Sequence, residues 1–261
     1  MKKISFKLIN YSSAIFIQAR LGSKRFPNKI TMNLYKNNNC LEFLIKRILK
    51  VFDKKSIFLL TTTKTNDKKL RKIAKKLKIN FFQGNEKNLI KRYLDCAKYH
   101  DISNIIRITA DCPYVDPLHI KKNFEFYIKQ NRFNYISNCT PYEKRTFAVG
   151  NDIEMFKTKY LEMALKMKLT NFQKEHISPF FLKFANNIYL IKNKNQDQNL
   201  RFTLDYPEDL ILLKKLTKHF SNPFTASYDK IIRILKKNTN LREINKKYVR
   251  IYYKKKIKNN Y

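Results

Sequence analysis

The stretch from residue 12 to residue 29 reads "SSAIFIQARLGSKRFPNK" and joins an apolar run to a basic loop. The run at 12–18 has the length and the aliphatic and aromatic side chains of a buried strand. The loop after it holds four cations, Arg20, Lys24, Arg25 and Lys29. Because the whole chain carries a formal net charge of +36, these cations do not mark a site by their number alone. Their position directly after a strand is the informative feature.

A short apolar run followed by a helical segment recurs through the first half of the chain. Further strands are predicted at 56–63, 80–84 and 104–109. Apolar residues at helical spacing predict the helices, which lie at 40–52, 66–78, 87–100 and 117–130. This alternation is typical of an α/β protein with a mostly parallel open sheet and helices on both faces.

The second half of the chain is less regular. Strands are predicted at 134–137, 187–193 and 200–204, with a loop and a strand over 144–155. Helices are predicted at 157–168, 171–185 and 207–220, and two short ones from residue 222 onward, before a charged end. We therefore expect one main domain over 1–220 and a helical C-terminal appendage over 221–261.

Composition favours a packed globular protein. Hydrophobic residues make up 43% of the chain and aromatic residues 14%, which is enough for a core. The charge of +36 would suit an acidic partner such as nucleic acid. However, the lysines are scattered along the whole chain, and no helix-turn-helix, zinc-finger or RNA-recognition signature accompanies them. We therefore expect no nucleic-acid partner and attribute the charge to compositional drift.

The cysteines and the apolar runs bear on location. Cys40, Cys96, Cys112 and Cys139 form no CxxC pair, which disfavours zinc and favours reduced thiols. No run approaches the roughly 18 apolar residues of a membrane span. The N-terminal stretch is interrupted by Lys7 and lacks a small-residue cleavage site, unlike a signal peptide. A cytoplasmic protein without a membrane span is the expectation.

Acidic residues follow two other predicted strands. Asp111 comes just after the strand at 104–109, and Asp205 just after the strand at 200–204. Ligands of open α/β sheets bind outside the carboxyl ends of the strands, so the basic loop and both carboxylates should share one edge. Read singly, each has a simpler role: the loop as a solvated turn, Asp111 as a turn cap and Asp205 as the N-cap of the next helix.

Together, these residues suit phosphate chemistry. Arg20, Arg25 and Lys29, with the backbone N–H groups around Gly22 and Ser23, could cradle a polyphosphate. Two carboxylates are what Mg²⁺ commonly takes from a protein when substrate phosphates supply further ligands. The expected chemistry is in-line attack on a phosphate whose charge the metal neutralises.

Six motifs carry a family resemblance. They are "IQARLGSKRFPNK" (17–29), "GNEKNLIKRY" (84–93), "RITADCPYVDP" (107–117), "GNDIEMF" (150–156), "EHIS" (175–178) and "LRFTLDYPEDL" (200–210). In this order they resemble the cytidylyltransferase-like family of spore-coat polysaccharide biosynthesis (SpsF type). That family is related to the synthetases of CMP-3-deoxy-manno-octulosonate and CMP-acylneuraminate. The resemblance covers about residues 12–250.

The resemblance implies a Rossmann-like, glycosyltransferase-A-like nucleotidyltransferase. Such an enzyme would use CTP and Mg²⁺ to make a CMP-sugar, with a sialic-acid-like or 2-keto-3-deoxy sugar acid as the acceptor, for cell-surface polysaccharide. Pyrophosphate would be released, and a homodimer is expected by analogy.

The resemblance also implies roles for individual residues. The catalytic residues would be Arg20, Lys29 and Asp111, and the metal ligands Asp111 and Asp205. The nucleotide-binding residues would be Gln18, Ala19, Arg20, Gly22, Ser23, Arg25, Lys29, Thr61, Thr62, Gly84 and Arg107. The sugar would be bound by Asn138, Asp152, Glu154, Glu175 and His176.

This chain departs from the family pattern at a few positions. Asn28 replaces a usual glycine, Lys24 a small hydroxyl residue and Ala148 a usual proline, while Lys87 and Asn88 replace acidic residues. Asn tolerates the left-handed backbone that a glycine position can require. None of these changes removes a predicted metal ligand.

Two other readings stay open at this point. A glycosyltransferase of related fold would usually carry a D-x-D metal motif, whereas Asp111 is followed by Cys112 and Pro113. A relative that kept the fold without activity would not need Asp111 and Asp205. Glu175 and His176 are conceivable general bases, although a histidine there more often orients a carboxylate or the substrate.

Overall fold

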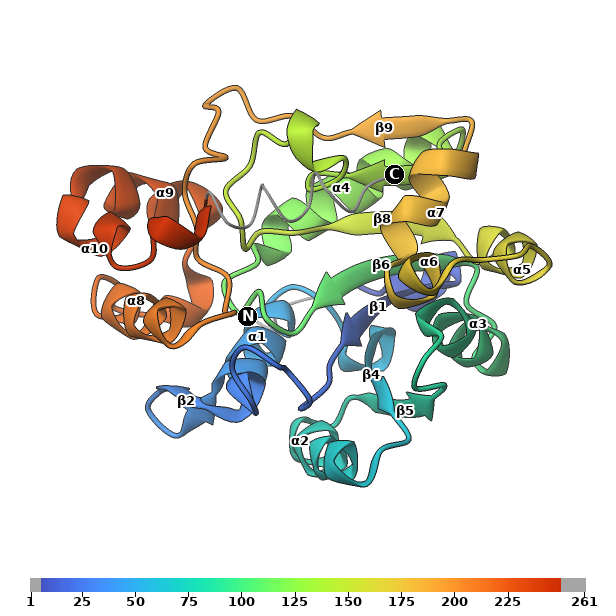
Figure 1. Ribbon diagram of the computed structural model, residues 1–261, viewed down its shortest axis with the longest axis horizontal. Helices are drawn as coiled ribbons and strands as arrows, with labels where there is room; N and C mark the ends of the chain where they lie inside the picture. Colours follow the sequence, from blue (N-terminus) through green and yellow to red (C-terminus); the bar gives the residue numbers. More distant parts are fainter. Residues whose placement is uncertain (1–5, 250–261) are drawn as a thin grey trace.

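The computed structural model describes residues 6–249, and the charged end of the chain lies outside this range. One seven-stranded sheet forms the centre of the molecule, in the order β5-β4-β1-β6-β8-β7-β9 (Figure 1). A separate two-stranded hairpin consists of β2 (Asn33–Tyr35) and β3 (Asn38–Asn39).

Four parallel strands make up one half of the sheet. They are β1 (Ser13–Gln18), β4 (Ile57–Thr62), β5 (Asn80–Gly84) and β6 (Asn104–Thr109). β1 lies between β4 and β6 and pairs in parallel with both. From β1 the chain proceeds outward to β4 and β5 and then returns to β6 on the other side. The carboxyl ends of β1 and β6 therefore flank the topological switch point, where open α/β sheets bind ligands.

The other half of the sheet is mixed. β8 (Glu154–Lys157) is antiparallel to β6, β7 (Tyr135–Ser137) is antiparallel to β8, and β9 (Ile188–Leu190) is parallel to β7. The predicted strand at 134–137 is confirmed, and that at 187–193 is shorter than predicted. Within 144–155 only the last two residues are strand, and β8 continues to residue 157.

The predicted strand at 200–204 is wrong. This segment makes a single bridge, between Arg201 and Val149, rather than a ladder. Its next backbone bond runs elsewhere: the N–H of Leu204 donates to the carbonyl of Asp111 at 2.8 Å. The segment is extended and apolar like a strand, but it divides its hydrogen bonds between two loops. It therefore ties the loop around residue 149 to the end of β6.

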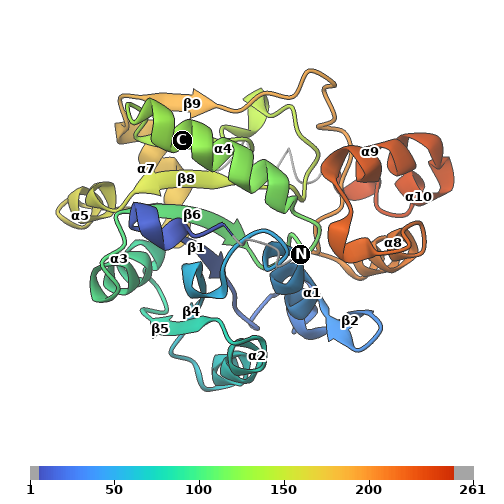
Figure 2. The ribbon, with the colours of Figure 1, turned by 180° about the vertical axis from the view of Figure 1, so that it is seen from behind.

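Alternate side chains of β1 enter two different cores, so helices cover both faces of the sheet (Figures 1 and 2). Ile15 and Ile17 pack with residues of α1 (Cys40–Ile48), α2 (Leu70–Leu77) and α4 (Pro117–Gln130). Ala14 and Phe16 pack with the opposite layer, which contains α3 (Leu89–Tyr99), α5 (Lys159–Leu165) and α7 (Ile177–Phe184). The predicted α/β class is confirmed.

The C-terminal helices belong to a third core. α8 (Pro207–Thr217), α9 (Tyr228–Lys237) and α10 (Thr239–Glu243) pack with residues of the 200–204 segment and of α1. The predicted helix at 171–185 is divided into α6 (Asn171–Glu175) and α7 by His176, whose backbone is extended. The boundary of the predicted appendage at residue 220 stays a prediction.

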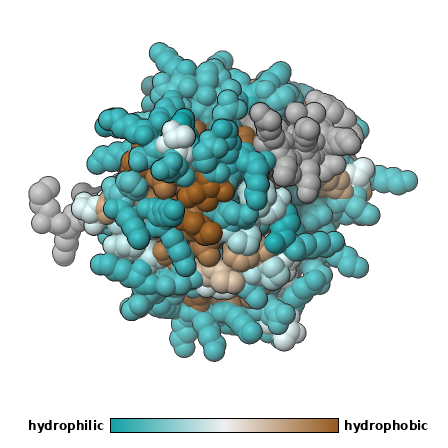
Figure 3. All heavy atoms as spheres, turned by 60° about the vertical axis from the view of Figure 1, so that its left-hand side comes forward, coloured by the Kyte–Doolittle hydropathy of each residue, from teal (hydrophilic) through white to brown (hydrophobic). Residues whose placement is uncertain are grey.

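Short 3-10 turns connect several elements. They are Leu8–Tyr11, Lys29–Thr31, Lys54–Ser56, Thr65–Lys69, Tyr142–Lys144 and Pro223–Thr225. Within residues 6–249, no helix is both long and apolar enough to cross a bilayer. Hydrophilic side chains form most of the face in Figure 3, and hydrophobic ones gather near its middle.

Candidate active site

The basic loop leaves the carboxyl end of β1 and is anchored at its start. The N–H of Ala19 donates to the carbonyl of Leu60 on β4 at 2.9 Å. The N–H of Leu21 then donates to Asp67 at 2.8 Å, and the hydroxyl of Thr62 donates to the other oxygen of Asp67. Asp67 is only 2% exposed. The sequence predicted only a helix over 66–78 here, and the anchoring of the loop by Asp67 was missed.

Asn28 turns the loop back toward the sheet. Its backbone is left-handed, with φ 56° and ψ 16°. This confirms the expectation that asparagine here satisfies a glycine-like conformation. The 3-10 turn that follows begins at Lys29, whose side chain is buried, whereas Gly22, Lys24 and Arg25 are exposed.

Lys29, Asp111 and Asp205 meet at one point. The Nζ of Lys29 lies 2.8 Å from Oδ2 of Asp111 and 2.8 Å from Oδ1 of Asp205. The Nη2 of Arg25 lies 2.6 Å from the same oxygen of Asp205. The loop after β1, the end of β6 and the 200–204 segment therefore converge, as the sequence predicted for the sheet edge.

The charges in this cluster stabilise one another. Burial alone would lower the pKa of Lys29, but Asp111 and Asp205 outweigh it and raise the pKa. Burial would likewise raise the pKa of both carboxyl groups. The charge of Lys29 keeps the pKa of Asp111 below its usual value, and Lys29, Arg201 and Arg25 do so for Asp205. The ammonium and both carboxylates are therefore charged at neutral pH.

A second aspartate holds Asp205 in place. The N-cap position of α8 is Tyr206, and the carboxylate of Asp209 accepts the N–H groups of Asp205 at 2.7 Å and Tyr206 at 3.0 Å. Arg201 binds Asp209 through two hydrogen bonds, of 3.0 and 2.8 Å, and reaches Asp205 at 3.1 Å. The reading of Asp205 as the N-cap is therefore wrong, and its carboxylate faces the cations instead.

Asp111 and Asp205 are the residues that could hold a divalent cation, although the described residues contain no cluster of three or more His, Cys, Asp or Glu side chains that could do so. A single ammonium lies within hydrogen-bonding distance of an oxygen from each, so both already converge on one positive charge. Carboxylate oxygens are the hard ligands that Mg²⁺ prefers. Cys112, beside Asp111, does not compete for this role. Burial raises the pKa of its thiol well above the usual value, so the thiol stays neutral, which agrees with packing.

Gln18 and Arg107, predicted near the nucleotide, contact each other. The Oε1 of Gln18 accepts from Nε and Nη2 of Arg107, at 3.2 and 3.1 Å. Arg107 also pairs with Glu154, which accepts from the hydroxyls of Tyr135 and Ser178. Glu154 is 2% exposed, so its nearest partners are protein groups, and its predicted contact with a sugar stays a prediction.

Gly84 ends β5 where an arginine packs across it. A Cβ at this position would lie 2.8 Å from Cγ of Arg92. The guanidinium of Arg92 donates to the carbonyls of Asn85 and Glu86, which shapes the following loop. The sequence had placed Arg92 only inside a helix. Thr61, predicted beside Thr62 on the nucleotide side, is fully buried at the end of β4.

The residues predicted to bind a sugar fall into two groups. Asn138 bonds the backbone of Asn151 and Ile153, at 2.6 and 2.8 Å, and Asp152 pairs with the fully buried Arg145. Arg145 also binds the carbonyls of Phe147 and Ala148, and no sequence motif indicated this role. These contacts hold the loop between β7 and β8.

The second group lies at the end of α6. Glu175 is the last residue of α6 and pairs with Arg20 of the basic loop at 3.1 Å. Both side chains are more than half exposed, at 53% and 55%. The ring of His176 lies 4.8 Å from that of Phe172. The basic loop therefore bridges the buried cluster at one end and the α6 end at the other.

The basic loop meets Asp111, which follows β6, and Asp205, which follows the 200–204 segment, and the fold around them is that of a nucleotidyltransferase enzyme. A family model for cytidylyltransferases matches residues 14–257. The chain therefore belongs to the cytidylyltransferase family, and the predicted SpsF-type resemblance is confirmed.

Three relatives show the range of similarity. A cytidylyltransferase from Leptospira borgpetersenii is 33% identical, with a TM-score of 0.81 over 88% of this chain and 96% of that one. The Bacillus subtilis spore coat polysaccharide biosynthesis protein SpsF is 30% identical over 128 residues, 47% of this chain and 53% of SpsF. A CMP:2-keto-3-deoxy-manno-octonic acid synthetase, solved with CTP, is 13% identical with a TM-score of 0.60 over 79% of this chain and 98% of that one, and it shares the fold.

Proposed function

We propose that this enzyme transfers the CMP moiety of CTP to a sugar and releases pyrophosphate. The observation that carries the proposal is the convergence of Lys29 with Asp111 and Asp205 at the carboxyl end of β1. Family membership supports the cytidylyl chemistry. A synthetase that shares the fold was solved with CTP, which supports CTP as the nucleotide.

The loop after β1 would bind the triphosphate. Arg20 and Arg25 have side chains that are 55% and 43% exposed, so they are accessible to an anionic ligand. A Cβ at Gly22 would meet no protein atom within 4 Å, so the backbone there is open to close approach. Arginine suits this task because its planar guanidinium binds phosphate oxygens bidentately.

The carboxylates would hold Mg²⁺, and Lys29 would keep them in place. When bound, Mg²⁺ would supply neutralisation of the charge on the α-phosphate. The sugar hydroxyl would attack the α-phosphorus and lose its proton to solvent water, a P–O bond to the sugar would form, and the bond to the β-phosphate oxygen would break. Lys29, Arg20 and Arg25 would stabilise the negative charge that the leaving pyrophosphate acquires.

The sugar would lie on the side of the β7–β8 loop and α6. The residues that the family resemblance assigns to the sugar belong to these two regions or to β8, and Glu175 reaches the basic loop through Arg20. They are Asn138, Asp152, Glu154, Glu175 and His176. A sialic-acid-like or 2-keto-3-deoxy sugar acid is the proposed acceptor. The product would serve the synthesis of cell-surface polysaccharide, as the name of SpsF suggests.

Pyrophosphate release tests the proposal. The protein is mixed with CTP, Mg²⁺ and a panel of 2-keto-3-deoxy and sialic-acid-like sugar acids, and pyrophosphate is measured. Thermal shift with the four nucleoside triphosphates identifies the preferred base, because a ligand of the folded state raises its stability. No release with any sugar, together with no binding of CTP, would overturn the proposal. That the protein is a homodimer and that it lies in the cytoplasm stay predictions. Light scattering would test the first and cell fractionation the second.

A further inference from the structure

After α10 the chain returns to the neighbourhood of Asp205, where Tyr248 stacks on Tyr206. The rings of Tyr248 and Tyr206 are parallel to within 5°, with centroids 3.7 Å apart. The guanidinium carbon of Arg25 lies 5.1 Å from the centroid of the Tyr206 ring. The guanidinium carbon of Arg201 lies 5.9 Å from the same centroid. Tyr206 is thus a platform between the C-terminal segment and a cation of the basic loop.

A buried asparagine makes a second link between the same two regions. Asn245 is 2% exposed and donates to Oδ1 of Asp209 at 2.7 Å. It also donates to the carbonyl of Arg201 at 3.3 Å. Asp209 in turn accepts the backbone N–H groups of Asp205 and Tyr206 through its other oxygen. One side chain of the C-terminal segment therefore completes the network that holds the backbone of Asp205.

A third set of contacts is exposed and weaker. The Nζ of Lys247 and the hydroxyl of Tyr248 both lie 2.9 Å from Oε1 of Glu208. The Lys247 side chain is 62% exposed, and exposed ion pairs contribute little to stability. Lys247 thus offers a matched control from the same segment.

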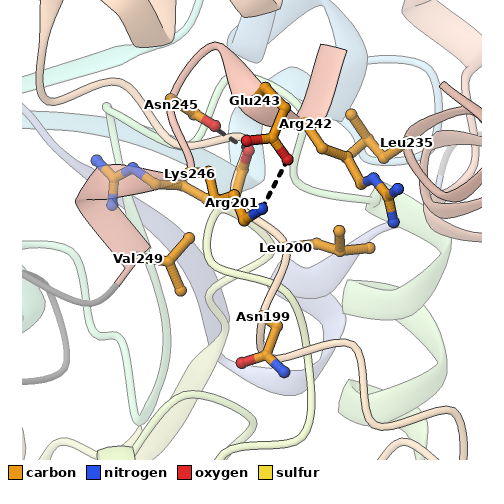
Figure 4. Close-up of a pocket in the computed structure, with 9 residues that line it drawn as sticks. All are labelled: Asn199, Leu200, Arg201, Leu235, Arg242, Glu243, Asn245, Lys246 and Val249. Carbon is orange, nitrogen blue, oxygen red and sulfur yellow. Dashed lines mark hydrogen bonds and ion pairs between the residues drawn. The ribbon is translucent and has the colours of Figure 1, made fainter. Parts of the chain in front are cut away.

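A cavity of about 220 Å³ lies beside these links (Figure 4). Its lining includes Leu200 and Arg201 on one segment and Asn245 and Val249 on the other. Packing between the two segments is therefore incomplete at this point. Beside the cavity, the Tyr248 stack and the Asn245 hydrogen bonds link the two segments.

We propose that Tyr248 and Asn245 are positioning residues for Arg25 and Asp205, which are proposed to bind the triphosphate and the metal. Tyr248 fixes the Tyr206 ring, which orients Arg25, while Asn245 fixes Asp209, which orients Asp205. This inference rests on the proposed function. Arg25 has a long, half-exposed side chain, and holding it in place before the ligand arrives lowers the entropy cost of binding. The helical C-terminal region is then a working part of the active site.

Calorimetric binding of CTP, and of inorganic tripolyphosphate, tests the inference in four proteins: wild type, Tyr248→Ala, Tyr248→Phe and Lys247→Ala. Removing the Tyr248 ring should weaken binding of both ligands about fivefold, since the Tyr206 ring and the Arg25 guanidinium beside it are then no longer held in place. Phenylalanine keeps the stack and should restore wild-type affinity, and Lys247→Ala should match wild type. Asn245→Ala should lower kcat more than it raises KM, since Asp205 rather than Arg25 is displaced.

The outcomes are separable. If wild type binds no nucleoside triphosphate, the proposed function fails. If wild type binds CTP and Tyr248→Ala binds it equally well with unchanged kcat, the positioning role is wrong. Equal losses in Tyr248→Ala and Tyr248→Phe would also overturn it, because the hydroxyl rather than the ring would then matter. Should Tyr248→Ala not fold, Tyr248→Leu takes its place, with the same criteria.

Discussion

The two ends of the basic loop make contrasting ion pairs. At one end, the Lys29 side chain is 10% exposed and forms ion pairs with Asp111 and Asp205. At the other end, Arg20 and Glu175 are both more than half exposed. A buried pair is fixed in place and costly to break, whereas an exposed pair is screened and readily exchanged. The cluster of Lys29, Asp111 and Asp205 is therefore preformed, whereas the Arg20 side chain can exchange Glu175 for a ligand.

Asp111→Asn should have the largest effect. It removes one of the two carboxylates proposed to hold Mg²⁺ while keeping the shape of the side chain. We expect turnover to fall about a thousandfold, the scale of losing a main electrostatic contact in a transition state. Pyrophosphate release measures the loss, and circular dichroism checks that the fold is intact. Near-normal activity of the variant would show that Asp111 is not one of the residues that hold Mg²⁺.

Lys29→Met should affect stability as well as activity. It leaves two carboxylates facing each other, although Arg25 and Arg201 still bind Asp205. We expect a loss of about 3 kcal/mol in the free energy of unfolding, in the range for a broken buried pair. Adding Mg²⁺ should raise the melting temperature of the variant more than that of wild type. Lys24→Met is the control, since Lys24 is exposed. Equal melting temperatures for both variants would mean that the cluster is not preformed.

Arg20→Ala should change binding without changing stability. An exposed ion pair contributes roughly 0–1 kcal/mol, so the melting temperature should stay within the error of the measurement. Loss of one phosphate-binding guanidinium should raise the Kd for CTP about tenfold. Lys24→Ala, in the same loop, should leave the Kd unchanged. Equal effects of the two substitutions would mean that the loop attracts phosphate by net charge alone.

The smallest expected effect is in the acid stability of the cluster. The pKa values of Asp111 and Asp205 are lower in the folded protein than the usual value. Their charges therefore stabilise the fold fully above that usual value, and this contribution is lost as the pH falls below about 4. Melting temperatures of wild type and Asp111→Asn, measured from pH 6 to pH 3, should converge toward low pH. A constant difference would contradict the assignment.

Most of the parallel half of the sheet could be predicted because its signals are local. The helix at 117–130 and the strand at 104–109 have the predicted bounds, since apolar periodicity and caps lie within each segment. The segment at 200–204 could not be resolved in this way. Its apolar pattern is that of a strand, but a ladder needs a partner, and its hydrogen bonds go to residues 149 and 111.

The sequence alone determined the α/β class, the position of the basic loop after the first strand and the candidate residues Lys29, Asp111 and Asp205. Only the tertiary structure decided how these groups are held. Asp67 anchors the loop from 46 residues away, Asp209 frees Asp205 from capping a helix, and Tyr248 stacks on Tyr206. Periodicity and caps are properties of residues close together in the sequence. These contacts join segments that are distant in the sequence and meet only in the folded protein.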